Sequence, residues 1–306
     1  MFSISAAFVT HAFTFFPDSR QHHHYIEVLL SGHMPFLQDK KIDQVEHQPP
    51  LYYVLAAPWL KLGEQFGTEG GVLAVRLWSL LLASGVILFT ILSARQLAPN
   101  AKYIPGLAAL IVGMNPQYFV MNAEINNDAL TSLLASIILF VIIRLALGWR
   151  PNTKWNTLIG WLAAAAFLTK LSLWPFVVGL LLFTWLVQPR RWSTTLRLGL
   201  PLLVLGGAWL IRNTVLYGDP TVMKLLYKYF GAEQHQEFLT PSGIWTWLTL
   251  LFETYWGRFR HITAGMHYQT YAALKIATVI SLAGVGVFIA TGWKNYKQIF
   301  AGHILC

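Results

Sequence analysis

The chain is poor in charge and nearly free of cysteine. Only 11% of its 306 residues are charged and 55% are apolar, whereas a soluble domain carries about 25% charged residues. Together with a mean hydropathy of +0.50, this composition favours a polytopic membrane protein. The one cysteine, Cys306, excludes both a disulfide framework and a cysteine-based metal site.

Motifs of the common nucleotide-binding folds are also missing. The sequence has no P-loop and no G-x-G-x-x-G signature, so energy from ATP is not implied. The net charge of +9 does not imply a nucleic-acid partner, because cytoplasmic loops of membrane proteins collect Lys and Arg. Residues 1–16 lack the basic n-region and cleavage site of a signal peptide. We expect a first membrane helix there, and a chain that is a fragment at both ends.

Long apolar runs predict an all-α bundle of about eight transmembrane helices, since one crossing needs roughly 20 apolar residues. Besides the first helix, the predicted spans are 73–94, 103–121, 129–147, 157–169, 171–187, 198–216 and 270–292. Lys170 divides the run from Thr157 to Val187, which is too long for one crossing, and therefore predicts a tight hairpin of two helices.

Basic residues predict the orientation. If the first helix leaves the cytoplasm, the cytoplasmic loops contain ten Lys or Arg and no acidic residue; these loops are 95–102, 144–156, 188–197 and 293–306. This asymmetry follows the positive-inside rule. We therefore expect a single transmembrane domain over 1–306, with a first external loop at 17–72 and a second at 217–269.

The first external loop contains the segment "VEHQPPLYYVL", residues 45–55. Its two prolines suit the first turn of a helix, and residues 49–62 have the length of an interfacial helix rather than a crossing. Glu46 and His47 are then expected at the outer membrane–water boundary.

The same loop opens with Asp18, which begins an amphipathic helix to about Leu30. Asp18 is either an N-cap or a general base at the membrane surface. His22, His23 and His24 point about 100° apart on a helix, so they cannot all bind one ion. We expect a solvated interfacial face here and no certain cofactor; a divalent metal held by one or two of these histidines stays open.

The external turn "NAEINNDAL" carries Glu124 and Asp128. In a helix these two would share a face; alternatively, Asp128 caps a helix that begins at Ala129. Both interpretations stay open.

Three cations lie near the predicted outer boundary: Arg76, Lys170 and Arg212. Such residues either snorkel to the interface or serve a polar pathway or anion, and three together suit a lipid-linked phosphate. Aromatic residues around the second loop predict an interfacial belt: Trp209, Tyr217, Trp245, Trp247, Tyr255 and Trp256.

The order of several short motifs resembles the GT-C superfamily of integral membrane glycosyltransferases. The nearest branches are family 39-like bacterial enzymes related to protein O-mannosyltransferases and aminoarabinose transferases. The resemblance covers roughly residues 11–290 and rests on "HQPPLYY", "RLWS", "NND", "LTK" and "WLIRN" followed by "YGDP".

The resemblance implies transfer of a sugar from a polyprenyl-phosphate donor outside the cytoplasmic membrane. It implies a catalytic base at Asp18, with Asp128 and Glu124 as further acidic groups. By the same resemblance, the donor phosphate lies near Arg76, Lys170 or Arg212, and Glu46, His47 and Tyr52 line the site. Where the family commonly has an acidic pair this chain has Asp18-Ser19, which weakens any metal-binding interpretation.

We therefore expect a multi-pass enzyme of the cell (inner) membrane, with its active site on the extracytoplasmic face and a lipid, glycan or protein as acceptor. The alternatives are a transporter or flippase of a lipid-linked sugar, and a non-catalytic scaffold. A transporter favours midplane charges and internal repeats, but the charges here gather at one face and the sequence shows no clear repeat.

Overall fold

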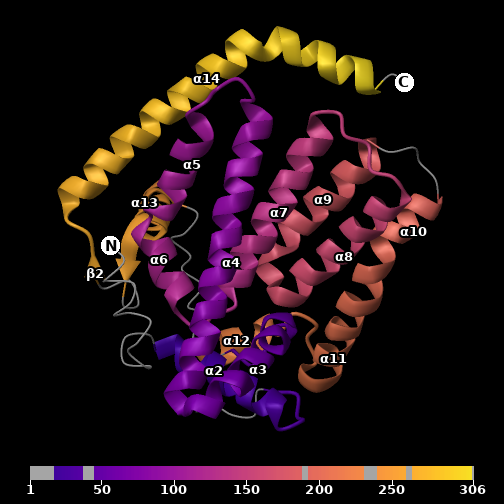
Figure 1. The fold of residues 1–306 in the computed structure, drawn as a ribbon, viewed down its shortest axis with the longest axis vertical. Helices are drawn as coiled ribbons and strands as arrows, with labels where there is room; N and C mark the ends of the chain where they lie inside the picture. Colours follow the sequence, from indigo (N-terminus) through magenta and orange to yellow (C-terminus); the bar gives the residue numbers. More distant parts are fainter. Residues whose placement is uncertain (1–16, 37–44, 188–191, 231–239, 260–263, 305–306) are drawn as a thin grey trace. The chain divides into compact units, whose positions relative to one another are not determined.

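The computed structural model describes residues 17–36, 45–187, 192–230, 240–259 and 264–304. Figure 1 shows that they are almost entirely helical, as the sequence predicts. The chain forms two compact units, with the boundary between residues 234 and 235.

Four described helices are long and apolar enough to cross a membrane. They are α4 (Thr68–Leu97), α7 (Asp128–Ala146), the continuous helix Trp192–Tyr217, and Tyr268–Val287 within α14 (Tyr268–Ile304). A fifth span results if the bent pair α5 (Ile104–Gly113) and α6 (Pro116–Ala123) crosses as one. These helices give the described part of the chain the character of a multi-pass membrane protein.

The bend between α5 and α6 lies within the predicted span 103–121 and was not predicted from the sequence. α5 and α6 meet at 60°. Asn115 has an extended backbone, and its side chain accepts a hydrogen bond from the N–H of Tyr118 at 3.0 Å. The physical cause is Pro116, which has no N–H to donate and disfavours helical geometry in the residue before it.

The break predicted at Lys170 is confirmed. α8 (Thr153–Thr169) ends there, Lys170 has an extended backbone, and a short 3-10 turn (Leu171–Leu173) leads into α9 (Trp174–Val187). α8 and α9 pack against each other as an antiparallel hairpin.

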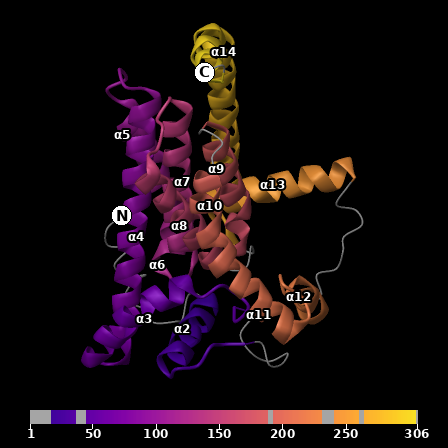
Figure 2. The same cartoon turned by 90° about the vertical axis from the view of Figure 1, so that its right-hand side faces the viewer.

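Two shorter helices, α2 (Pro17–Leu30) and α3 (Leu51–Gly63), lie at one end of α4, α7 and α8, as both Figure 1 and Figure 2 show. The sequence predicts both helices. After a 3-10 turn (Glu64–Phe66), the chain reverses into α4. α3 and α4 approach so closely that a Cβ on Gly63 would collide with the carbonyl oxygen of Gly70.

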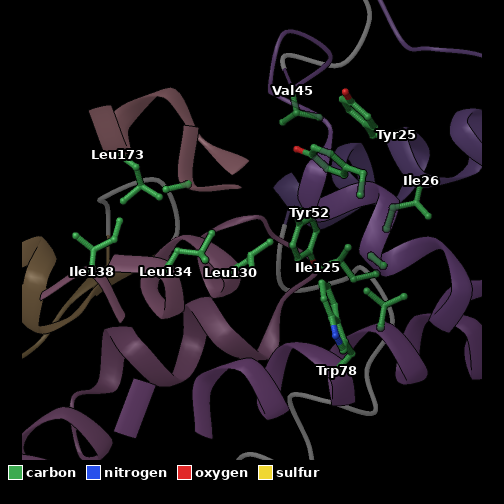
Figure 3. Packing of buried hydrophobic residues seen from close by; sticks show 14 of the residues in the cluster. Tyr25, Ile26, Val45, Tyr52, Trp78, Ile125, Leu130, Leu134, Ile138 and Leu173 are labelled. Atoms are coloured by element: carbon green, nitrogen blue, oxygen red, sulfur yellow. The ribbon is translucent and has the colours of Figure 1, made fainter. Parts of the chain in front are cut away.

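A continuous apolar core joins this end to the bundle (Figure 3). Tyr25 and Ile26 of α2 and Tyr52 of α3 belong to the same buried cluster as Trp78 of α4 and Ile125. The cluster continues along α7, α8 and α9 through residues such as Leu134, Ile138, Ile159 and Val177. The end of the bundle where α2 and α3 lie is therefore part of the packed core.

The remainder of the first unit is the long helix formed by α10 (Trp192–Pro201), a π-helical turn (Leu202–Gly206) and α11 (Gly207–Tyr217). Gly218 ends it with a positive φ of 67°. Asp219 then accepts hydrogen bonds from the N–H groups of Thr221 and Lys224, which leads into α12 (Met223–Phe230).

The second unit contains α13 (Pro241–Gly257), a strand pair and α14. β1 (Arg258–Phe259) is antiparallel to β2 (Ala264–Gly265). The Tyr271 hydroxyl donates to the carbonyl of Gly257 at 2.7 Å and accepts from the N–H of Met266 at 3.0 Å. Tyr271 thus ties the first turns of α14 to the strand pair.

Candidate functional site

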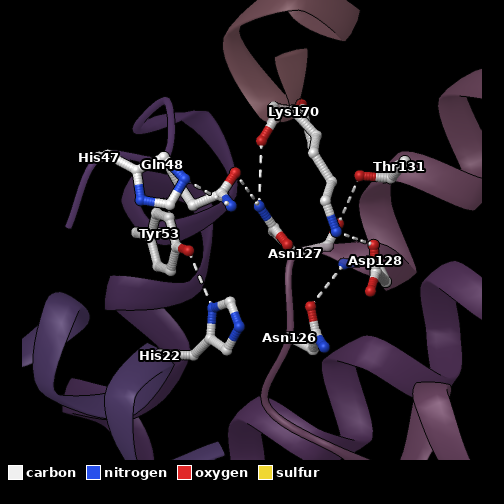
Figure 4. Close-up of polar contacts among 10 residues, drawn as sticks. His22, His47, Gln48, Tyr53, Asn126, Asn127, Asp128, Thr131 and Lys170 are labelled. Atoms are coloured by element: carbon white, nitrogen blue, oxygen red, sulfur yellow. Dashed lines mark hydrogen bonds and ion pairs between the residues drawn. The ribbon is translucent and has the colours of Figure 1, made fainter. Parts of the chain in front are cut away.

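An ion pair lies within a polar cluster, at the end of the bundle where α2 and α3 lie (Figure 4). Nζ of Lys170 is 2.5 Å from Oδ1 of Asp128. The two side chains are 25% and 24% exposed. The pair is formed because Lys170 follows the end of α8 and Asp128 begins α7, at the same end of the bundle.

The loop before α7 explains why the Asp128 carboxylate is available for this pair. The side chain of Asn126, not Asp128, accepts a hydrogen bond from a helix N–H: its Oδ1 receives the N–H of Asp128 at 3.0 Å. Asp128 is inside the first turn, where its charge still complements the helix dipole. The prediction that Asp128 caps a helix starting at Ala129 is therefore wrong.

The other interpretation, a helical face shared by Glu124 and Asp128, is also wrong. Glu124 has φ −94° and ψ 163° after the end of α6, so the backbone there is extended. The two acidic groups are used separately, one with Lys170 and one beside Arg76.

Asn127 connects three segments that are distant in sequence. Its Nδ2 donates to the carbonyl oxygen of Thr169 at 3.2 Å and to Oε1 of Gln48 at 3.4 Å. Gln48 in turn contacts the Nε2 of the half-buried His47 at 3.3 Å. Asn127 is only 1% exposed. Sequence reasoning assigned no role to Asn126 or Asn127, although the "NND" motif contains both.

The histidine run does not form a solvated face. His22 and His23 are buried, and only His24 is substantially exposed. Nδ1 of His22 lies 2.8 Å from the hydroxyl of Tyr53. Burial, and next the charge of Lys170, lower the pKa of His22 to about 3. The prediction of a solvated face is therefore wrong, because α2 packs the side that carries His22 against α3.

The described residues contain no group of three or more His, Cys, Asp or Glu side chains that could hold a metal ion.

The Tyr53 ring stacks on Tyr25 at 3.7 Å between centroids. Tyr25 donates its hydroxyl to the carbonyl of Gln48 at 3.0 Å. This stack holds the segment before α3 against α2.

Arg76 is completely buried in α4. The Glu124 carboxylate, itself 8% exposed, is the charged group that acts on it electrostatically. Snorkelling is therefore wrong for Arg76, because protein encloses the side chain. Tyr52 lies beside them: its hydroxyl is 3.4 Å from Oγ of Ser79 and accepts the backbone N–H of Asn126. Burial raises the pKa of Tyr52.

Arg212 is the third predicted cation, and its contacts differ. Its guanidinium stacks over Trp209 at 4.6 Å and donates to the carbonyl of Pro35 at 2.5 Å and to Oδ1 of Asn213 at 3.2 Å. Among the described residues no carboxylate pairs with it. Its charge reaches Tyr25, which places it beside the α2 side of the cluster. Trp209 is 4% exposed, so its assignment to an interfacial belt is wrong.

Two further predicted acidic residues are Asp18 and Glu46. Asp18 belongs to the first turn of the described helix α2, and its side chain lies outside the described residues. Glu46 is buried, close enough to Tyr25 to act on its hydroxyl.

Comparisons with protein-family models, with curated proteins and with solved structures found no match to this chain. The resemblance to the GT-C superfamily therefore remains an interpretation of the sequence motifs.

Proposed function

We propose that the protein is a membrane glycosyltransferase that moves a sugar from a polyprenyl-phosphate donor to an acceptor hydroxyl at the extracytoplasmic face of the cell membrane. The supporting observation is the Asp128–Lys170 pair. It is about one quarter exposed, although its neighbours Asn126, Asn127 and Tyr52 are buried. A partly exposed ion pair among buried polar groups suits the binding of a polar substrate group, and its charges act on charge that develops during transfer.

The membrane arrangement is part of the same proposal. About eight helices form a GT-C-type bundle, and α2 and α3 lie along the outer membrane surface. The positive-inside rule then puts the polar cluster outside the cytoplasm. The acceptor, whether lipid, glycan or protein, approaches from that side, and the donor comes from the membrane.

The proposed reaction transfers a proton to Asp18 and releases a polyprenyl phosphate. The Asp18 carboxylate takes the proton of the acceptor hydroxyl while the acceptor oxygen bonds to the anomeric carbon of the sugar. The bond between that carbon and the phosphate oxygen breaks, and the phosphate leaves with the electron pair. A polyprenyl phosphate results, and its negative charge requires a cation.

The three cations divide this work according to their partners. The charge of Lys170 is balanced by Asp128 and that of Arg76 by Glu124. Within the described part of the chain, Arg212 donates to neutral hydrogen-bond acceptors only, and a guanidinium suits phosphate geometry. We therefore assign the departing phosphate chiefly to Arg212, with Lys170 and Arg76 setting the field around it.

The test is transfer from a panel of radiolabelled polyprenyl-phosphate sugars in membranes that contain the chain. Asp18→Asn is compared with wild type and with the matched control Glu69→Gln, which changes an exposed acid at the start of α4. Transfer that is lost only in Asp18→Asn, at equal protein level, supports the proposal. Transfer unchanged by Asp18→Asn moves the base to Asp128 or Glu124. No transfer from any donor contradicts the enzyme proposal and favours a flippase, which a lipid-flipping assay then examines.

A further inference from the structure

The amide of Asn127 has a fixed orientation. Its Nδ2 faces the backbone carbonyl oxygen of Thr169 at 3.2 Å, which can only accept a hydrogen bond. Exchanging the two ends of the amide would set two oxygens against each other. The nitrogen therefore faces Thr169 and Gln48, and the oxygen Oδ1 faces the opposite way.

This Oδ1 atom is buried and accepts no hydrogen bond from any residue that the structure describes. Buried acceptors in folded proteins are nearly always paired, so an exception calls for a specific explanation. A ligand group that donates to the atom would be such an explanation, because the atom lies beside a partly exposed ion pair. Figure 4 shows Asn127 between Gln48 on one side and the Asp128–Lys170 pair on the other.

The charge balance defines the chemistry of a ligand at this point. Asp128 neutralises Lys170, and His22 adds no cation near neutral pH because burial lowers its pKa to about 3. A phosphate would meet the Asp128 carboxylate and the Asn127 oxygen, both of which are acceptors. A hydroxyl group, in contrast, donates to an acceptor such as Oδ1 and accepts from Lys170 Nζ.

We propose that Asn127 is a specificity-determining residue whose Oδ1 accepts a hydrogen bond from a sugar hydroxyl of the lipid-linked substrate, beside the Asp128–Lys170 pair. The identity of the ligand rests on the proposed function. The substrate is then recognised at two places: its phosphate at Arg212 and its sugar at Asn127. The sugar is selected by a hydroxyl in one position and not by charge.

The experiment measures binding and needs no transfer. The purified chain in detergent is titrated with polyprenyl phosphate carrying glucose, mannose, galactose or arabinose, and with the same polyprenyl phosphate without sugar. We expect wild type to bind at least one sugar-bearing lipid about five- to tenfold more tightly than the sugarless lipid, which corresponds to one net hydrogen bond. Asn127→Ala removes this preference and leaves the affinity for the sugarless lipid within about twofold.

Asn156→Ala is the matched control. Asn156 is also a buried asparagine whose Oδ1 accepts no hydrogen bond from a described residue, but it lies near the start of α8, at the far end of that helix from Lys170. It is expected to keep the preference for the sugar. If Asn127→Ala does not fold, monodeoxy forms of the preferred sugar lipid test wild type directly: one of them must lose about the same five- to tenfold in affinity.

Two results overturn the inference: equal binding of all five lipids by wild type, or a sugar preference that survives in Asn127→Ala. Equal binding is also what a water molecule at Oδ1 would produce. Failure of the proposed function has a different signature. A sugar preference that depends on Asn127, without any transfer in the membrane assay, supports the sugar site and contradicts only the glycosyltransferase.

Discussion

Nζ of Lys170 lies 2.5 Å from Oδ1 of Asp128, although 42 positions separate the two residues in the sequence. Each side chain is about one quarter exposed. The sequence presents one as a second acid and the other as a phosphate-binding cation. In the structure they are first of all each other's partner, so any substrate group that enters has to share or replace this contact.

Breaking the pair from either side is expected to destabilise the fold. Asp128→Asn leaves Lys170 without its counter-charge, and Lys170→Met does the same to Asp128; we expect each to cost about 1–3 kcal/mol, less than a fully buried pair would. The double variant is expected to cost less than the sum, with a coupling of about 0.5–3 kcal/mol. Denaturation in detergent micelles gives the free energy of unfolding of wild type, both single variants and the double variant. Strictly additive losses of this free energy would contradict an interaction between the two side chains.

The energetic coupling between Arg76 and Glu124 is expected to be larger than that between Asp128 and Lys170, because both residues are buried. Arg76→Met leaves a buried carboxylate beside an apolar side chain, at an expected cost of about 3–5 kcal/mol. Adding Glu124→Gln is expected to recover part of this loss, since the uncompensated charge is removed. The control is Arg95→Met, at the exposed end of the same helix, with an expected change within about 0.5 kcal/mol. The same unfolding assay checks the recovery; its absence would refute the coupling.

The buried His22 predicts a loss of stability in acid. Its pKa is about 3 in the fold, lowered by burial and by Lys170 and His47 against the opposing charge of Asp128, whereas an unfolded histidine titrates near 6.5. The unfolded chain therefore binds more protons between these values. Stability is complete above about pH 6.5 and falls progressively as the pH drops toward about 3.

His22→Gln removes this titration. Relative to wild type, the variant is expected to lose less stability on acidification, by on the order of 2 kcal/mol at about pH 5. Unfolding midpoints measured at two pH values for wild type, His22→Gln and the exposed control His24→Gln provide the comparison. If all three proteins lose stability equally, His22 is not the group responsible.

The contact between α8 and α10 depends on a glycine. A Cβ at Gly160 would collide with the carbonyl oxygens of Arg197 and Leu198, which belong to backbone and cannot turn aside. Gly160→Ala is expected to destabilise the protein by about 1–3 kcal/mol. Gly199→Ala on α10 has nothing within 4 Å of the added atom and is expected to be neutral or stabilising by up to about 1 kcal/mol. Thermal unfolding in detergent measures both variants, and equal effects would contradict the packing argument.

Local signals in the sequence were sufficient where a single residue controls the backbone. The break at Lys170 follows from an apolar run too long for one crossing, and α2 and α3 follow from their composition and from Pro49-Pro50. Pro116 carries the same kind of signal, but the apolar composition of 103–121 hid it. The interpretation that Glu124 and Asp128 share a helical face is wrong because spacing alone cannot show that the backbone at Glu124 is extended.

The sequence by itself determined the multi-pass membrane character, the apolar helices and the asymmetry of basic residues between loops. These features depend on hydropathy and charge along the chain. The tertiary structure alone decided the partners. It paired Lys170 with Asp128, placed Glu124 beside Arg76, left Arg212 with neutral acceptors, and buried two of three consecutive histidines. The physical reason is that the energy of an interaction between charges, or of a hydrogen bond, depends on distance and burial. Both are fixed only when helices distant in sequence pack together.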